Sequence, residues 1–359
     1  MQPVPDINIS KRHFKAAVNN PAKAAKAVSL IYVSNSEPGY TRHRRGKSFY
    51  YKDGNKKVSN PEIIERIRKL VIPPAWENVW ICKKENGHLQ VTGTDKLGRK
   101  QYRYHANWSA IRNQTKFYRL YEFGTQLPRI REQLSEKLSM SGYPKEKILA
   151  AIVSLLEQTN IRIGNTLYEK LYGSFGLTTM KNRHVAVEGS KISFSFRGKK
   201  GIQHDIRLTS RKLATIVKAC KEIPGKELFE YIDEEGVVHK VDSGMVNEFI
   251  RNLSGAEFSA KDFRTWAGSV YALSAFSETE DIKDDAERKR RIPAVFDAVA
   301  GHLGNTRTVC KKYYVHPAIV SLYEENKLNK YFPDTEPIKE QHGLNLYEQA
   351  LMAILSGQQ

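Results

Sequence analysis

Residues 144–165 read PKEKILAAIVSLLEQTNIRIGN, and their apolar positions indicate the kind of domain to which they belong. Four aliphatic residues recur at i, i+4, i+7 and i+8, the spacing of one face of an α-helix: Ile148, Ile152, Leu155 and Leu156. Pro144 suits the first position of such a helix. The stretch therefore predicts a buried helix that leads into Arg162.

Helical patterns continue towards the C-terminus and are interrupted by one hairpin. Caps followed by apolar residues at helical spacing predict helices after residues 209–210, after Ser243 and after Ser259. A further helix is expected from Pro293 to Leu303, with Gly304 as its stop, and the last stretch, 344–355, is amphipathic. Alternation over 192–197, a Gly-Lys-Lys-Gly turn and the run 202–208 predict the hairpin. Residues 131–359 are thus expected to form a mainly α-helical domain.

The N-terminal third shows short alternating runs cut by turn residues, which indicates a small sheet. The predicted strands lie at 48–51, 79–82 and 89–91. One helix is expected from Pro61 to Leu70. We therefore predict a sheet-rich domain over 29–108, preceded by a loosely held basic extension over 1–28 and followed by a charged connector over 109–130.

The charge of the chain points to a polyanionic partner. Its 58 Lys and Arg residues against 39 Asp and Glu residues give a net charge of +19 and a pI near 9.6. The first 110 residues hold 21 basic and 8 acidic side chains, so the N-terminal third is the more basic part. Nucleic acid, or an anionic membrane face, fits this excess.

The positions of the cysteines and the hydropathy of the chain indicate which compartment and which kinds of site to expect. Cys82, Cys220 and Cys310 lie far apart, without the spacing of a zinc site or a disulfide framework. No stretch approaches the roughly 20 apolar residues of a membrane span. A cytoplasmic protein without a metal centre or a membrane anchor is expected.

Five dispersed residues have the side-chain types needed to break a phosphodiester with a tyrosine: Arg162, Lys199, Arg264, Asn305 and Tyr314. Two guanidiniums can hold the phosphate, an ammonium can protonate the leaving oxygen, an amide can donate a further hydrogen bond and a phenol can attack. Considered one at a time, four of these residues also have an explanation that involves no catalysis. Lys199 could belong to a solvated turn, the arginines could form surface ion pairs, and Tyr314 is one of 18 tyrosines.

Residues 98–105, GRKQYRYH, alternate bases with aromatics and predict a nucleic-acid-binding strand. On a strand one face would carry Arg99, Gln101 and Arg103, and the other Lys100, Tyr102 and Tyr104. Such a strand could grip phosphates and contact bases. The alternative is a half-buried strand whose tyrosines point inward.

With these motifs in order, the chain from about Leu30 to Tyr323 resembles the type IB DNA topoisomerases, and among them the compact bacterial and poxvirus-like branch. The resemblance rests on IPPAW at 72–76, the 98–105 stretch, IRIGN at 161–165, GLTT at 176–179, FRGK at 196–199, KDFRTW at 261–266 and YVHP at 314–317.

The resemblance implies a role for each residue of the site. Tyr314 would be the nucleophile, Arg162 and Arg264 would clamp the scissile phosphate, and Lys199 would be the general acid. Asn305 stands where poxviral and eukaryotic relatives use histidine, so it would keep the phosphate contact without a positive charge.

Five further residues are implied at the DNA: Lys261 and Tyr168 near the phosphate, and Gln101, Tyr102 and Tyr104 on the duplex. The implied fold is α+β, a small mixed-sheet DNA-gripping domain joined to a mainly helical catalytic domain with a β-hairpin. The implied reaction is relaxation of supercoils through a 3'-phosphotyrosyl intermediate, by a monomer that clamps duplex DNA, needs no ATP, metal or other cofactor, and lies in the cytoplasm with the nucleoid.

Two other functions share parts of this pattern. Tyrosine recombinases use the same chemistry, but they usually place histidine where Lys261 stands and lack the basic sheet domain. A non-catalytic duplex-binding clamp would keep the charge and lose the turnover, although all the expected catalytic residue types are present here.

Overall fold

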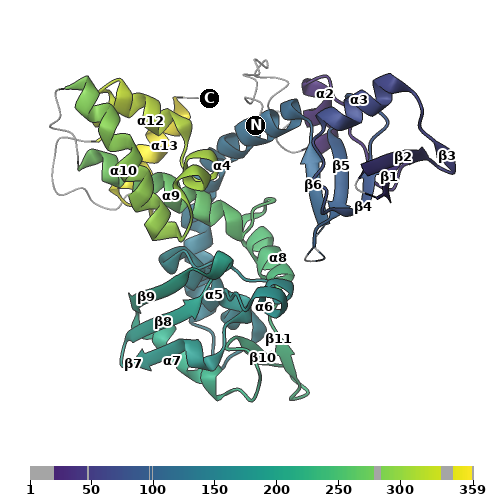
Figure 1. Cartoon of the computed structure of the whole chain (residues 1–359). Helices are drawn as coiled ribbons and strands as arrows, with labels where there is room; N and C mark the ends of the chain where they lie inside the picture. The colour runs from purple at the N-terminus through teal and green to yellow at the C-terminus, as the bar shows by residue number, and fades with distance from the viewer. Residues whose placement is uncertain are drawn as a thin grey trace. The chain divides into compact units, whose positions relative to one another are not determined.

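A computed structural model describes residues 20–46, 48–96, 98, 100–278, 284–332 and 343–357. The chain divides between Arg119 and Leu120 into two compact units, whose elements are labelled in Figure 1. One helix, α4 (Ala106–Leu138), runs through this boundary, and the predicted connector at 109–130 lies within it. In the described part of the chain, no helix combines the length and the apolar character that crossing a membrane requires.

The first unit is built on a six-stranded antiparallel sheet in the order β3-β2-β1-β4-β5-β6. Its elements are α2 (Pro21–Ala27), β1 (Tyr40–Arg45), β2 (Ser48–Asp53), β3 (Lys56–Lys57), α3 (Pro61–Lys69), β4 (Glu77–Ile81), β5 (Leu89–Thr94) and β6 (Lys100–Tyr104). The three predicted strands and the predicted helix are present. Helix α3 begins where expected because the Asn60 side chain accepts hydrogen bonds from the amides of Glu62 and Ile63.

The residues just before this sheet are held more firmly than the sequence predicted. Residues 1–19 of the predicted extension lie outside the described residues. Residues 21–27, however, form α2, whose Ala24 and Ala25 are fully buried against Trp108 and Ile111. Alanine side chains form no evident apolar face in the sequence, but their small size allows close packing against a large ring.

The second unit is mainly helical with two small sheets. Its elements after α4 are α5 (Lys145–Thr159), α6 (Thr166–Tyr172), η1 (Leu177–Thr179), η2 (Asn182–His184), β7 (Val185–Glu188), β8 (Lys191–Arg197), η3 (Lys199–Gly201), β9 (Gln203–Thr209), α7 (Arg211–Glu222), β10 (Glu230–Ile232), β11 (Val238–Lys240), α8 (Ser243–Ser254), α9 (Ala260–Ser277), α10 (Asp285–Leu303), α11 (Arg307–Tyr313), α12 (Pro317–Glu324), η4 (Leu328–Tyr331) and α13 (Leu346–Ser356). The α+β class predicted from the sequence is confirmed.

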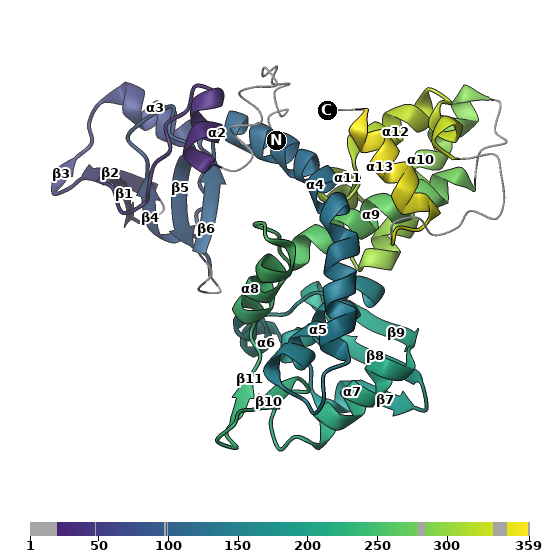
Figure 2. The same cartoon turned by 180° about the vertical axis from the view of Figure 1, so that it is seen from behind.

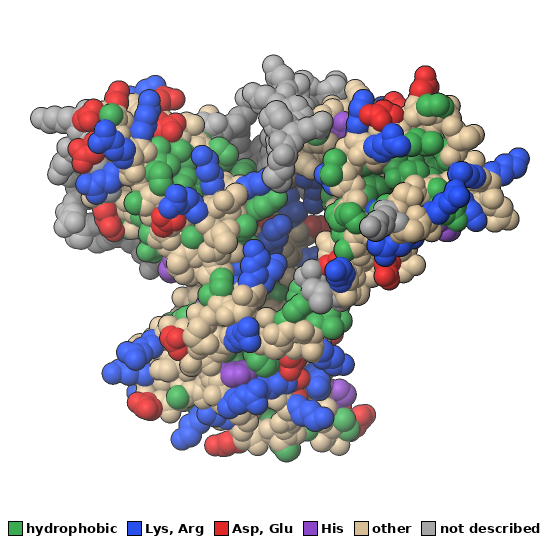
Figure 3. Space-filling model, viewed as in Figure 1, with side chains coloured by type: hydrophobic (Ala, Val, Ile, Leu, Met, Phe, Trp, Pro, Cys, Tyr) green, Lys and Arg blue, Asp and Glu red, His purple; other side chains and the backbone are tan. Residues whose placement is uncertain are grey.

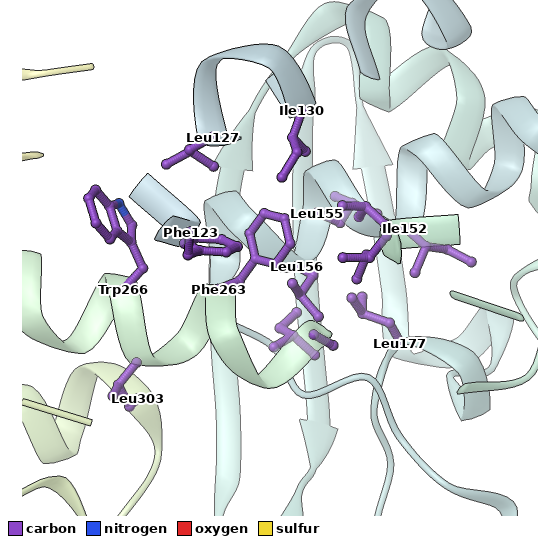
Figure 4. Packing of buried hydrophobic residues seen from close by; sticks show 14 of the residues in the cluster. Phe123, Leu127, Ile130, Ile152, Leu155, Leu156, Leu177, Phe263, Trp266 and Leu303 are labelled. Carbon is purple, nitrogen blue, oxygen red and sulfur yellow. The ribbon is translucent and has the colours of Figure 1, made fainter. Parts of the chain in front are cut away.

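Helix α5 is the centre of this unit, as its apolar pattern predicted. All four aliphatic residues of the pattern are fully buried. Pro144 lies at the N-cap, one residue earlier than expected. Figure 4 shows Ile152, Leu155 and Leu156 of α5 packed in one core with Phe123 of α4 and Phe263 of α9. The helix that ends just before Arg162 is therefore anchored on several sides.

Several parts of the second unit differ from the prediction, and one of them is a second, unpredicted hairpin formed by β10 and β11. Helix α10 begins at Asp285 instead of Pro293, because the Asp284 carboxylate caps the helix by accepting from the amides of residues 286 and 287. Pro293 lies inside the helix without ending it. The predicted hairpin is present as β8 and β9, with a third, unpredicted strand, β7, beside β8. Figure 2 shows this sheet with α7, which packs on β7 and β8, and with α5, which packs on β9.

The C-terminal helix α13 is fastened to α4 and α9 by a buried carboxylate, and its packing on this unit was expected from its amphipathic sequence. Glu348 accepts hydrogen bonds from Arg131 at 2.7 and 3.0 Å and from the Trp266 indole at 3.0 Å. Burial alone would raise the pKa of Glu348, but the hydrogen bonds and charge of Arg131 outweigh it and lower that pKa. The carboxylate is therefore ionised and paired at neutral pH.

Removing this carboxylate should destabilise the protein strongly. Glu348→Ala leaves the Arg131 guanidinium without its main partner, and we expect a loss of about 3–5 kcal/mol in the free energy of unfolding, measured by urea denaturation. The matched control is Glu325→Ala, which removes the exposed ion pair with Lys327 and should cost less than about 1 kcal/mol. Equal losses in the two variants would contradict the role given to Glu348.

Candidate active site at the C-terminal end of helix α10

Two arginines meet the last carbonyl groups of α10. Gly304 ends the helix in a left-handed conformation, with φ of +57°. The Nη2 atom of Arg264 donates to the Leu303 carbonyl at 2.6 Å, and Nη2 of Arg162 donates to the Gly304 carbonyl at 3.0 Å. Because the C-terminal end of a helix carries partial negative charge, it offsets part of the repulsion between the two cations.

Arg264 is the more deeply buried of the pair, with only 4% of its surface exposed. It lies in the first half of α9, and its Nη1 atom donates to the carbonyl of Asn160, the left-handed residue that ends α5. Burial lowers the pKa of Arg264. Among the described residues its Nε–H finds no acceptor. A buried N–H without an acceptor carries an energetic cost.

Arg162 is partly buried and connects the helix end to Asn305. Its Nη2 atom also donates to the Asn305 side-chain oxygen. Burial, followed by the charge of Arg264, lowers the pKa of Arg162 to about 10, which still leaves it charged at neutral pH. Within the described ranges, the Asn305 amide nitrogen makes one long contact, of 3.5 Å, to the Leu303 carbonyl. With its oxygen occupied by Arg162, Asn305 can direct its N–H groups towards a phosphate oxygen.

Tyr314 follows α11 and lies beside Arg264. The centre of the Arg264 guanidinium is 5.5 Å from the centroid of the Tyr314 ring. Its neighbour Tyr313 has a different environment, with the Lys312 ammonium 5.3 Å from its ring centroid. Tyr314 thus contacts a site arginine through its ring.

The backbone of Tyr314 is positioned by α9. The Ser269 hydroxyl donates to the Tyr314 carbonyl at 3.2 Å and accepts from the amide of His316 at 3.1 Å. Gly268 allows this approach, since a Cβ atom there would lie 2.7 Å from the Tyr314 carbonyl oxygen. Roles for Gly268, Ser269 and Asn160 were not predicted from the sequence, because their contacts join segments that are far apart in the chain.

Lys199 lies in the turn η3 between β8 and β9, and its side chain is largely exposed. Neighbouring atoms nevertheless remove water from its ammonium, and this desolvation, followed by the charge of Arg162, lowers the pKa of Lys199. Tyr314 and Arg264 also act on it electrostatically. All five residues predicted to carry the chemistry therefore lie around one helix end.

The predicted DNA contacts of the second unit are exposed. Lys261 begins the turn of α9 that carries Arg264, and Tyr168 on α6 is 39% exposed, with its ring 5.8 Å from that of Tyr172. Figure 3 shows Lys and Arg side chains spread over the visible face of the part that carries β7, β8 and β9. An anionic ligand would be attracted to this face.

In the first unit, β6 presents its tyrosines to solvent. Tyr102 and Tyr104 are 47% and 44% exposed and stack on each other with centroids 6.0 Å apart, while Lys100 lies 5.6 Å from the Tyr102 ring. The alternative of inward-pointing tyrosines is therefore wrong. Gln101 lies on the other face and donates to Asp95 at 2.8 Å. Arg99 lies outside the described residues.

Two glycines near the end of α10 should respond to alanine with opposite signs. Gly301 lies in the helix with open space at its Cβ position, so Gly301→Ala should stabilise the protein by about 0.5–1 kcal/mol. Gly304→Ala should destabilise it by more than about 1 kcal/mol, because the left-handed conformation disfavours a side chain and the new Cβ would lie 2.2 Å from His204 Cε1. Thermal unfolding of both variants measures this, and a stabilised Gly304→Ala would contradict the geometry.

Comparison with known proteins points to one family along most of the chain. The model of the family described as "Eukaryotic DNA topoisomerase I, catalytic core" matches residues 105–341. The model described as "Bacterial DNA topoisomerase IB, N-terminal domain" matches residues 48–95. The two matches fall mainly in the second and the first unit respectively.

Individual relatives agree with the family models. DNA topoisomerase 1B of Acanthamoeba polyphaga mimivirus is 33% identical over 297 residues, which cover 80% of this chain and 88% of that protein. DNA topoisomerase 1B of vaccinia virus (strain Copenhagen) is 22% identical over 78% of this chain and 90% of its own length. DNA topoisomerase 1 of rabbit fibroma virus is 23% identical over 75% of this chain and 87% of its own length. The resemblance drawn from the motifs is thus confirmed, and the chain belongs to the type IB DNA topoisomerases.

Proposed function

We propose that this member of the DNA topoisomerase IB family relaxes supercoiled duplex DNA by cleaving one strand transiently with Tyr314. The observation that carries the proposal is the meeting of Tyr314 with Arg264, within 5.5 Å, at a helix end that also holds Arg162 and Asn305. A phenol needs cationic neighbours to act as a nucleophile, and these arginines provide them.

In the first step Tyr314 gives its phenolic proton to solvent water, and its oxygen attacks a backbone phosphorus. A phosphotyrosyl bond forms to the 3' side of the strand, and the bond from phosphorus to the 5' oxygen breaks. Arg162 and Arg264 bind the non-bridging oxygens and stabilise the added negative charge of the five-coordinate transition state. The amide of Asn305 donates a further hydrogen bond but adds no charge.

In the same step Lys199 gives a proton to the departing 5' oxygen, which leaves as a hydroxyl. The free strand can then rotate about the intact one. Religation reverses every transfer: the 5' hydroxyl returns its proton to Lys199 and attacks phosphorus, and the Tyr314 oxygen leaves and takes a proton back from solvent water. Because the phosphotyrosyl bond retains the energy of the broken linkage, the cycle consumes no ATP and needs no metal.

Both units contribute DNA contacts in this proposal, so that a monomer holds the duplex as a clamp. In the first unit Tyr102 and Tyr104, with Lys100 and Gln101, approach the bases and phosphates from the exposed edge of β6. Arg99, which precedes Lys100 in the sequence, is proposed as a further DNA contact. In the second unit Tyr168 and Lys261 bind phosphates next to the cleavage site.

A plasmid assay in EDTA without nucleotide tests the proposal. The wild-type protein should relax a supercoiled plasmid and leave a covalent protein–DNA adduct after detergent quenching. Tyr314→Phe should lose both by at least about a thousandfold, because no nucleophile remains. Tyr313→Phe, the matched control, should keep both.

The outcomes separate the alternatives. An adduct that persists in Tyr314→Phe would refute the choice of nucleophile. A wild-type protein that binds DNA but forms no adduct would be a non-catalytic clamp. An adduct that forms only on specific sites, without relaxation of a plain plasmid, would indicate a recombinase.

The pH dependence of cleavage should report on Lys199. An acid must carry its proton to act, so the single-turnover cleavage rate should be level below the pKa of Lys199 and fall by about tenfold per pH unit above it. Because burial and Arg162 lower that pKa, the fall should begin below the value of about 10.4 expected for an ordinary lysine. The descending limb should vanish in Lys199→Ala, and its persistence there would assign it to another group.

A further inference from the structure

His204 lies at the meeting point of the two parts of the site. It is on β9, directly opposite Phe196 of β8, and the two rings stack with centroids 5.1 Å apart and planes 15° apart. Phe196 is buried in the core. The imidazole is therefore held in place by a ring that the hydrophobic core itself fixes.

Two glycine backbones lie against this imidazole. A Cβ atom on Gly198 would lie 2.6 Å from His204 Cδ2 and Nε2, and one on Gly304 would lie 2.2 Å from Cε1. Real Cβ atoms do not approach other atoms this closely, so the ring occupies the space that a side chain at either glycine would need. His204 is thus in contact with two segments that are about a hundred residues apart in the chain.

Each of these segments carries a different part of the proposed chemistry. Gly198 directly precedes Lys199, the proposed proton donor. Gly304 accepts from Arg162 and directly precedes Asn305, two of the groups proposed to bind the phosphate. The imidazole therefore lies between the segment that carries the proposed proton donor and the segment that carries the phosphate-binding groups.

The charges around His204 favour a neutral ring that separates the two segments over a protonated ring that adds positive charge to the site. Burial, followed by the charges of Arg162 and Arg264, lowers the pKa of His204, and Asp205 opposes them only in part. A neutral ring beside two guanidiniums adds no positive charge to the site. A neutral His204 ring can therefore act on the site only through its shape and its fixed, stacked position on Phe196.

We propose that His204 is a positioning residue, which keeps the Lys199 turn at a set distance from the C-terminal end of α10. The inference rests on the proposed function, in which Lys199 protonates the 5' oxygen. The turn itself is exposed at Lys199 and Lys200, so a spacer at its base determines where the ammonium stands. A displacement of about 1 Å in a reacting group can cost on the order of a hundredfold in rate.

The test compares two DNA substrates in single-turnover cleavage. One has the ordinary 5' oxygen at the scissile bond, and the other a 5' bridging sulfur, which leaves without protonation. His204→Ala should cleave the oxygen substrate roughly 10- to 100-fold more slowly than wild type and the sulfur substrate at nearly the wild-type rate. His204→Phe keeps a ring that stacks on Phe196 and should restore most of the lost rate.

His239→Ala is the matched control. His239 is also a histidine on a strand, β11, and stacks on Tyr231 with centroids 5.3 Å apart, but its neighbour is Asp233 and not the site. Its removal should leave the rates on both substrates unchanged. His204→Gln provides a second variant if His204→Ala proves unstable in thermal unfolding, and it should show the same selective defect in weaker form.

Lys199→Ala on the same two substrates separates this inference from the proposed function. If Lys199→Ala is slowed equally on oxygen and sulfur, the proton-donor role itself fails. Suppose instead that Lys199→Ala cleaves the sulfur substrate at nearly the wild-type rate, which supports the proton-donor role. If His204→Ala or His204→Gln then cleaves both substrates equally slowly, the positioning role of His204 is overturned. A His204→Phe variant as slow as His204→Ala would also overturn it, because ring shape would not be the property required.

Discussion

The carbonyl groups at the C-terminal end of α10 are the constraint on which the site depends. Two guanidiniums that lose water side by side repel each other and bear a desolvation cost. Leu303 and Gly304 offset this by giving Arg264 and Arg162 one acceptor each, at the helix end where peptide dipoles concentrate negative charge. Both arginines therefore keep their charge in a partly dry site, and a phosphate would complete their neutralisation.

The other site groups reach this helix end because three positions have no side chain. Gly304 turns the chain so that Asn305 meets Arg162, and Gly268 lets α9 approach the backbone of Tyr314. Gly198 leaves room for the His204 ring below the turn that carries Lys199. Close backbone approach thus brings together segments from α9, α10, α11 and the β8–β9 hairpin. The same helix α9 also holds the C-terminal helix through Trp266, so the stability of the fold and the geometry of the site depend on shared contacts.

Where local signals were strong, the sequence was sufficient to predict the elements. The aliphatic spacing in α5 and the helix expected from Pro61 to Leu70 correspond to a buried helix and to α3 in the structure. The failures at α2 and β7 arose where the decisive partner is distant in the chain. The burial of α2 depends on Trp108, and the short strand β7 exists because β8 offers it a hydrogen-bonding edge. Neither partner can be recognised from the segment itself.

The sequence by itself determined which side chains are available and, through its motifs, the family to which they belong. It identified two arginines, a lysine, an asparagine and a tyrosine as the residue types for phosphodiester chemistry. Only the tertiary structure decided what holds them: the carbonyls of Asn160, Leu303 and Gly304, and the ring of His204. Every residue carries a carbonyl group, so its use as an acceptor leaves no mark in the sequence and depends only on where the folded chain passes.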